Sequence, residues 1–145
     1  MIYKYFDELE IGEKTVSERA RTITETDVVF FCYFTGNWYE LHSNVEYAKK
    51  TQFGERLVQG SLTFAIAAGL QMVRHDVVMA FYGLDKMRFP SPVKIGDTLR
   101  AEAEVVDKEV KGDDRGVVTI KQTIHNQRDE TVAIMFWKLL VKRKK

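Results

Sequence analysis

The chain has 145 residues, with 22 lysines and arginines against 21 aspartates and glutamates and a net charge of +1. A domain of this length buries roughly two thirds of its unfolded surface in one core, so a single domain over residues 1–145 is predicted. The balanced charge provides no overall field for nucleic acid or an anionic membrane, and neither is expected as a partner.

The amino terminus and the cysteine content both bear on the compartment. The first residues, MIYKYFDELE, contain acids where a secretory signal needs a continuous apolar stretch. The single cysteine, Cys32, lies in the apolar run VVFFCYF, where we expect it to be buried, and it has no partner for an internal disulfide. Both observations favour a cytoplasmic protein in a reducing compartment.

Two short helices are predicted in the first third of the chain. The first spans Thr26 to Thr35, with an N-cap and acidic first turn in the segment TETD and a stop at Gly36. Its apolar composition predicts that it is buried. The second spans Val45 to Lys50, with Asn44 as its cap.

Between these helices, the segment FTGNWYELH carries Asn37 and His42 five residues apart. At that spacing two side chains lie about 140° apart on a helix and on opposite faces of a strand. If Asn37 and His42 act together, the chain must turn from Trp38 to Leu41. The segment is therefore either a site that handles water or an ordinary loop that contains a histidine.

From Leu57 to Val73 the chain carries no charge. Four polar residues interrupt this segment, and it falls short of the roughly twenty apolar residues that cross a bilayer, so a membrane span is not expected. We predict a central helix whose small side chains allow other backbones to approach closely. These small residues are Ala65, Ala67, Ala68 and Gly69.

After Arg74 the composition changes to β-branched and aromatic runs separated by polar turns, which indicates antiparallel strands. The predicted strands are Val77–Tyr82, Met87–Phe89, Leu99–Asp107, Val117–Ile124 and Thr131–Val141. Pro90 and Pro92 fit only at a strand end or edge. Together these elements predict an α+β fold in which a curved antiparallel sheet wraps one long central helix. A sheet of this kind leaves an edge to cover, so a dimer is expected.

The segment TGNWYELHSNVEYAKKTQFGERLVQGSL resembles the signature of the MaoC-like, (R)-specific enoyl-CoA hydratase (hydratase 2) family, and its spacing matches without a gap. FDELEIG near the start, and FPSPV with Gly96-Asp97 later, match further parts of the family pattern. The resemblance implies a hot-dog fold, a homodimer or dimer-based oligomer, and acyl thioesters of coenzyme A or acyl carrier protein as substrates. The matching residues are Thr35, Gly36, His42, Tyr47, Ala48, Phe53, Gly54 and Gly60.

The resemblance also implies roles for individual residues. Hydration of an enoyl thioester needs a group that orients and deprotonates water, a proton for the α-carbon, and donors for the charge on the thioester oxygen. By the resemblance, His42 handles the water, and the backbone N–H of Gly60, at the start of the central helix, binds the oxygen. The free N–H groups and the dipole of a helix amino terminus favour such a charge.

Several positions depart from the family pattern. Asn37 stands in place of the catalytic aspartate, and an amide can hold a water but cannot accept its proton near neutral pH. Gln59 replaces a histidine, and Ala68 replaces a serine that supports the carboxylate in some members. Either Glu40 supplies the missing carboxylate, or the chain binds acyl thioesters without the parent reaction.

Three functions therefore stay open from the sequence. They are an enoyl-thioester hydratase or 3-hydroxyacyl-thioester dehydratase, a catalytically silent acyl-thioester binder or partner subunit, and a thioesterase that uses His42 or Glu40 to activate water. His75 and His125 are interpreted as structural or exposed. No metal is expected, because the histidines and the cysteine lack ligand spacing, and no cofactor is expected.

Overall fold

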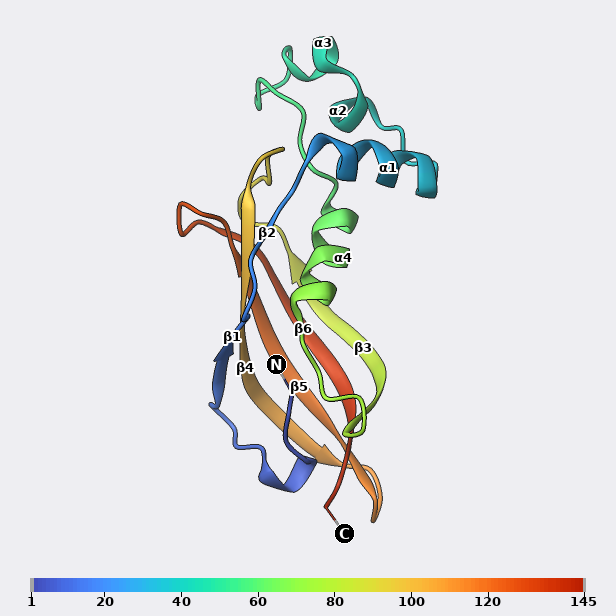
Figure 1. Ribbon diagram of the computed structural model, residues 1–145, viewed down its shortest axis with the longest axis vertical. Coiled ribbons are helices and arrows are strands. Elements are labelled where there is room, and N and C mark those ends of the chain that lie inside the picture. The colour runs from blue at the N-terminus through green and yellow to red at the C-terminus, as the bar shows by residue number, and fades with distance from the viewer. Residues whose placement is uncertain (1, 145) are drawn as a thin grey trace.

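The computed structural model describes residues 2–144. Its main layer is an antiparallel sheet that curves around helix α4 (Gly60–Leu70) (Figure 1). The strands follow the order β1-β4-β5-β6-β3, and β2 also pairs with β4. The predicted α+β architecture, a curved antiparallel sheet around one helix, is confirmed. The strand bounds are β1 Lys14–Val16, β2 Arg21–Thr22, β3 Val78–Arg88, β4 Thr98–Val110, β5 Arg115–His125 and β6 Thr131–Lys142.

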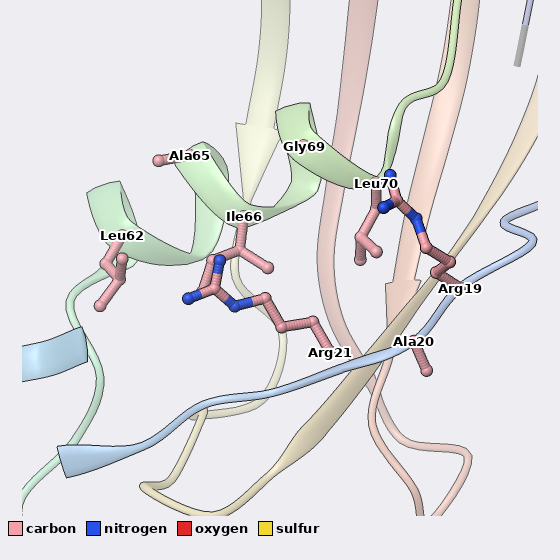
Figure 2. Close-up of a pocket in the computed structure, with 8 residues that line it drawn as sticks. All are labelled: Arg19, Ala20, Arg21, Leu62, Ala65, Ile66, Gly69 and Leu70. Carbon is pink, nitrogen blue, oxygen red and sulfur yellow. The ribbon is translucent and has the colours of Figure 1, made fainter. Parts of the chain in front are cut away.

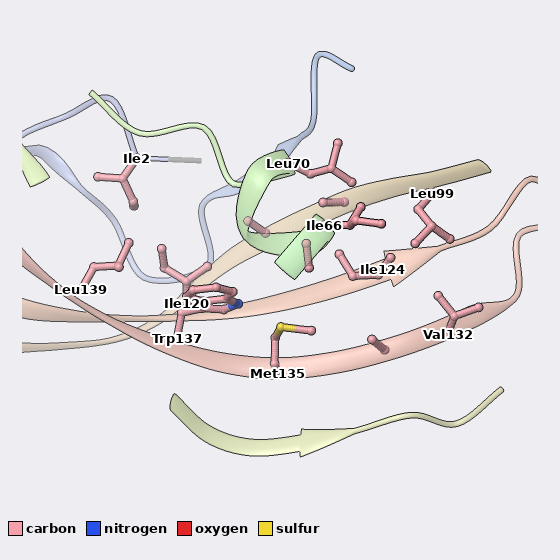
Figure 3. Close-up of a cluster of buried hydrophobic side chains, with 14 of the residues drawn as sticks. Ile2, Ile66, Leu70, Leu99, Ile120, Ile124, Val132, Met135, Trp137 and Leu139 are labelled. Carbon is pink, nitrogen blue, oxygen red and sulfur yellow. The ribbon is translucent and has the colours of Figure 1, made fainter. Parts of the chain in front are cut away.

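Strands β5 and β6 are inner strands of the sheet. Buried residues alternate along most of β6 and the second half of β5, whereas residues 116–120 of β5 are all buried. Trp137 on β6 pairs with Ile120 on β5, and its ring stacks on Phe64 of α4 with 5.1 Å between centroids. Figure 3 shows Ile66 and Leu70 of α4 lying over these strands. The period-two pattern that predicted the strands therefore also identifies the face that packs against the helix.

Strand β3 joins the two strands predicted at Val77–Tyr82 and Met87–Phe89 into one. Its pairing with β6 shifts register three times, and Lys86 adopts a positive φ of 49°. The residues between the two apolar runs lack a strand signal, but an edge strand tolerates bulges of this kind. Pro90 and Pro92 follow the end of β3, as expected.

Helix α4 is shorter at both ends than the predicted range Leu57–Val73. Leu57 forms an antiparallel bridge with Lys94, and the Val58 N–H donates to the Val93 carbonyl at 2.9 Å. At the other end Val73 forms a parallel bridge with Ile2. An uncharged run fits a buried extended segment as well as a buried helix, so composition alone could not place these boundaries.

The first helices begin near their predicted positions. Helix α1 spans Glu25–Thr35, and α3 spans Val45–Ala48 with the Asn44 side chain accepting from the Tyr47 N–H at 3.1 Å. A single turn not predicted as a helix, α2, spans Glu40–Ser43. The three helices lie beyond the amino-terminal end of α4, clear of the sheet (Figure 1).

The predicted burial of the first helix is wrong for the single chain. Only Val28 and Cys32 of α1 are buried, whereas Phe30, Tyr33 and Phe34 are 65%, 79% and 77% exposed. An apolar sequence predicts that a helix needs partners on most sides, and one copy of the chain covers only one side of α1.

Candidate active site

The segment between Asn37 and His42 turns, as the sequence required for the two residues to cooperate. Helix α1 stops at Gly36, which adopts the left-handed conformation with φ of 74°, and its N–H donates to the Cys32 carbonyl at 2.8 Å. The His42 N–H then donates to the Tyr39 carbonyl at 2.9 Å, and this hydrogen bond forms the start of α2. A glycine suits this stop because a side chain would strain a backbone with positive φ.

One hydrogen bond fixes the ring of His42. Its Nδ1 lies 2.8 Å from the Leu57 carbonyl oxygen. A carbonyl can only accept, so Nδ1 carries the hydrogen, and in the neutral ring the lone pair is then on Nε2. The Tyr39 ring packs edge-on against the imidazole, with 5.7 Å between centroids. His42 therefore presents Nε2 as a proton acceptor.

Leu57 connects this histidine to the start of the central helix. Its N–H donates to the Leu41 carbonyl at 3.2 Å, so both of its backbone polar groups hold the α2 segment. Leu57 also lines a cavity of about 320 Å³ at the amino terminus of α4. Most of the cavity wall is apolar, and the lining residues are Phe53, Leu57, Val58, Gly60, Thr63, Phe89, Pro90, Ser91, Pro92 and Val93.

Gly60 begins α4 at the wall of this cavity. The preceding residue, Gln59, makes no side-chain cap, so the first N–H groups of α4 have no capping side chain. The Phe89 ring lies so close that a Cβ at Gly60 would be 3.0 Å from its Cε2 atom. The sequence indicated Gly60, but the close approach of Phe89 depends on the folded path after β3.

Gln59, the residue before Gly60, makes contacts that the sequence did not reveal. Its side chain is fully buried, and Nε2 donates to the Val28 carbonyl at 3.2 Å and to Cys32 Sγ at 3.0 Å. The amide therefore ties α1, which leads into Asn37, to the residue before Gly60. In the sequence, the signal for these contacts was a polar residue inside an uncharged segment.

Polar contacts also hold the start of α1. Burial raises the pKa of Asp27, but hydrogen bonds from the Thr24 N–H and hydroxyl, together with Arg21, outweigh it and leave the pKa below its ordinary value. Nearby, Arg56 pairs with Glu25 at 2.7 Å. An ionised carboxylate in the first turn also suits the helix dipole.

The other predicted residues are Asn37, Glu40 and Ala68. Asn37 is half-buried, and its backbone N–H donates to Thr35 Oγ1 at 3.3 Å. Glu40 is exposed, and its carboxylate accepts from Asn44 Nδ2 at 3.0 Å. Ala68 lies on the exposed side of α4. The structure thus links His42, Leu57 and Gly60 and directs the Glu40 carboxylate to the cap of α3.

Residues 2–144 contain no group of three or more His, Cys, Asp or Glu side chains placed to hold a metal ion. Over the same residues, every helix is too short or too polar to cross a bilayer.

Residues 7–127 match the family model described as MaoC-like domain. Among curated proteins, MaoC of Klebsiella aerogenes is 39% identical over 110 residues, which cover 74% of this chain and 32% of MaoC. The chain thus corresponds to about a third of that protein. 3-Hydroxyacyl-thioester dehydratase Z of Mycobacterium tuberculosis is 32% identical, with 78% of both chains covered. The (R)-specific enoyl-CoA hydratase of Rhodospirillum rubrum is 30% identical, with 72% of both covered.

Solved structures match the fold of this chain. A monoamine oxidase regulatory protein from Archaeoglobus fulgidus has a TM-score of 0.91 and 40% identity, covering 100% of this chain and 98% of that one. A Mycobacterium tuberculosis protein with a double hot-dog fold has a TM-score of 0.83 and 20% identity, covering 97% and 44%. The predicted hot-dog fold is confirmed.

Proposed function

The chain belongs to the family of MaoC-like domains, and we propose that it hydrates 2-enoyl thioesters and dehydrates (R)-3-hydroxyacyl thioesters of coenzyme A or acyl carrier protein. The observation that carries this proposal is the 2.8 Å hydrogen bond between His42 Nδ1 and the Leu57 carbonyl. It leaves Nε2 as the acceptor and fixes the ring to a residue that lines the cavity at the start of α4. Relatives named as hydratases and dehydratases support the reaction class.

In this proposal one water adds across the 2,3-double bond. Asn37 orients the water, and His42 Nε2 takes one of its protons while the oxygen bonds to C3. The electron pair of the double bond moves toward the thioester, and the Gly60 N–H donates to the oxygen that gains charge. The protonated His42 then returns the proton to C2, so the product contains one added water.

A second candidate function follows from Asn37. Its amide cannot accept a proton, and the Glu40 carboxylate is exposed and bonded to Asn44. His42 is then the sole proton acceptor of the proposed site. If one acceptor does not suffice, the protein binds acyl thioesters without turning them over.

We also propose that two copies form a homodimer, or the unit of a larger oligomer, through the β3 edge and the open face of α1. Strand β3 ends the sheet order, so its outer side has no partner strand among residues 2–144. Paired edges and a covered α1 would remove a large apolar surface from water. The exposed apolar residues there are Met79, Phe81 and Tyr82 on β3 and Val29, Phe30, Tyr33 and Phe34 on α1. Analytical ultracentrifugation at micromolar concentration should give at least the mass of a dimer, and a monomer would contradict the proposal.

The change His42→Ala tests the proposed base. We expect the hydration rate to fall by at least about a hundredfold, the usual scale for a positioned acid or base. The purified protein is incubated with a panel of enoyl-CoAs, and loss of the conjugated double bond is followed in parallel with release of free thiol. Loss of the double bond reports hydration, and thiol release reports thioester hydrolysis. A folded variant with the parental rate would exclude His42 from the chemistry.

The change Asn37→Asp tests whether the amide at position 37 lowers the hydration rate. A carboxylate at position 37 should raise the rate on short enoyl-CoAs, because the proposed site then contains a second proton acceptor. A half-buried carboxylate carries a desolvation cost, so the gain is expected to be larger together with Ala68→Ser. Glu40→Gln is the matched control and should leave the parental rate unchanged. If the folded variant with both Asn37→Asp and Ala68→Ser turns over none of the enoyl-CoAs, the hypothesis that Asn37 weakens a hydratase site is wrong.

A further inference from the structure

The cavity at Gly60 is the one to which His42 is connected. A larger cavity, of about 380 Å³, lies between residues 19–21 and α4 (Figure 2). It has no lining residue in common with the cavity at Gly60, and neither His42 nor Leu57 lines it. The bond to Leu57 therefore holds His42 at the smaller cavity, and the other contacts of the ring decide in which direction Nε2 points there.

The ring of His42 has a second contact besides the bond at Nδ1. The outer torsion of a histidine side chain is broad, so a ring bonded at one atom can still tilt about that bond. The Tyr39 ring packs against the imidazole with 5.7 Å between centroids and 77° between planes. An edge-on aromatic pair has a preferred geometry and therefore opposes the tilt. The bond to Leu57 and the contact with Tyr39 together fix the direction of Nε2.

The Tyr39 side chain is itself held, although the residue is 56% exposed. Its ring packs edge-on against the ring of Tyr47 on α3, with 6.3 Å between centroids. A hydrogen bond with Tyr39 raises the pKa of the Tyr47 hydroxyl, as expected for a hydroxyl that donates, so the Tyr39 oxygen accepts. The Asn44 side chain caps α3 by accepting from the Tyr47 N–H at 3.1 Å. Both the ring and the hydroxyl of Tyr39 therefore contact a capped helix.

The backbone of Tyr39 holds the same histidine. Its carbonyl accepts from the His42 N–H at 2.9 Å and from the Ser43 hydroxyl at 3.3 Å. These bonds place the His42 backbone in α2, and the Tyr39 side chain then bounds the imidazole. Every residue type supplies the same carbonyl, so a substitution at position 39 changes the ring contact and leaves the backbone contacts in place.

We propose that Tyr39 is a positioning residue whose ring directs His42 Nε2 toward the attacking water. The proposal rests on the proposed function, which makes Nε2 the acceptor of the water proton. Tyr39 exchanges no proton in the reaction and acts through His42. Its contribution is large because His42 is the sole proton acceptor of the proposed site and must also return the proton to C2. An imidazole that tilts away from the water slows both steps.

NMR relaxation of the His42 ring tests the proposal without any turnover. In the parent, the order parameter of the ring Cε1–H bond should be that of a rigid group, about 0.85. In Tyr39→Leu, which removes the ring, it should fall below about 0.6, the range of a flexible group. Tyr39→Phe keeps the ring and should retain the parental value, as should Tyr3→Leu, a control at another partly exposed tyrosine. Equal values for the parent and Tyr39→Leu, or an equal loss in Tyr39→Phe, would overturn the proposal.

Kinetics on a short enoyl-CoA provide a second arm. Tyr39→Leu should lower kcat about tenfold with KM near the parental value, because the proton acceptor is misdirected while the cavity wall is unchanged. Tyr39→Phe should retain most of the parental kcat, and Tyr3→Leu should leave both constants unchanged. A loss that appears only in KM would show that Tyr39 does not act through His42. If the parent turns over no enoyl-CoA, the hydratase proposal fails, and the order parameters still decide whether Tyr39 positions the ring.

Discussion

The hydrogen bond between His42 Nδ1 and the Leu57 carbonyl is the constraint on which the candidate site depends. It exists because Leu57 stays extended: its bridge to Lys94 keeps residue 57 out of the helix. The same extended path delays the start of α4 until Gly60. One short segment therefore fixes the tautomer of the histidine and places the free N–H groups of a helix at the wall of the same cavity.

The contacts around this segment explain why the site is divided between two parts of the fold. The first turn of α4 and the segments before α4 and after β3 supply the cavity wall, while the loop after α1 carries Asn37 and α2 carries His42. Gln59 joins the two parts, because its buried amide donates to the α1 backbone and to Cys32. In the proposed reaction His42 both takes the proton from water and returns it to C2. The rate therefore depends more on the position of His42 relative to Gly60 than it would in a site with two acid–base groups.

The sequence predicts those features that depend on neighbours along the chain. The caps at Thr24 and Asn44 and the stop at Gly36 are local, and the strands show their period of two because one face meets the core. Features that depend on distant partners are not predicted. The ends of α4 depend on Ile2 and Lys94, and the exposure of Phe30 depends on what covers α1. The roles of Gln59 and Phe89 likewise arise from contacts that only the folded chain creates.

The tautomer of His42 is the most direct measure of this constraint. Two-dimensional NMR that correlates the ring nitrogens of histidine with its carbon-bound protons distinguishes a protonated from an unprotonated nitrogen. At a pH where the ring is neutral, His42 should show a proton on Nδ1 and a lone pair on Nε2. A proton on Nε2 would mean that Nδ1 does not donate to Leu57, and it would contradict the assignment of His42 as the proton acceptor of the site.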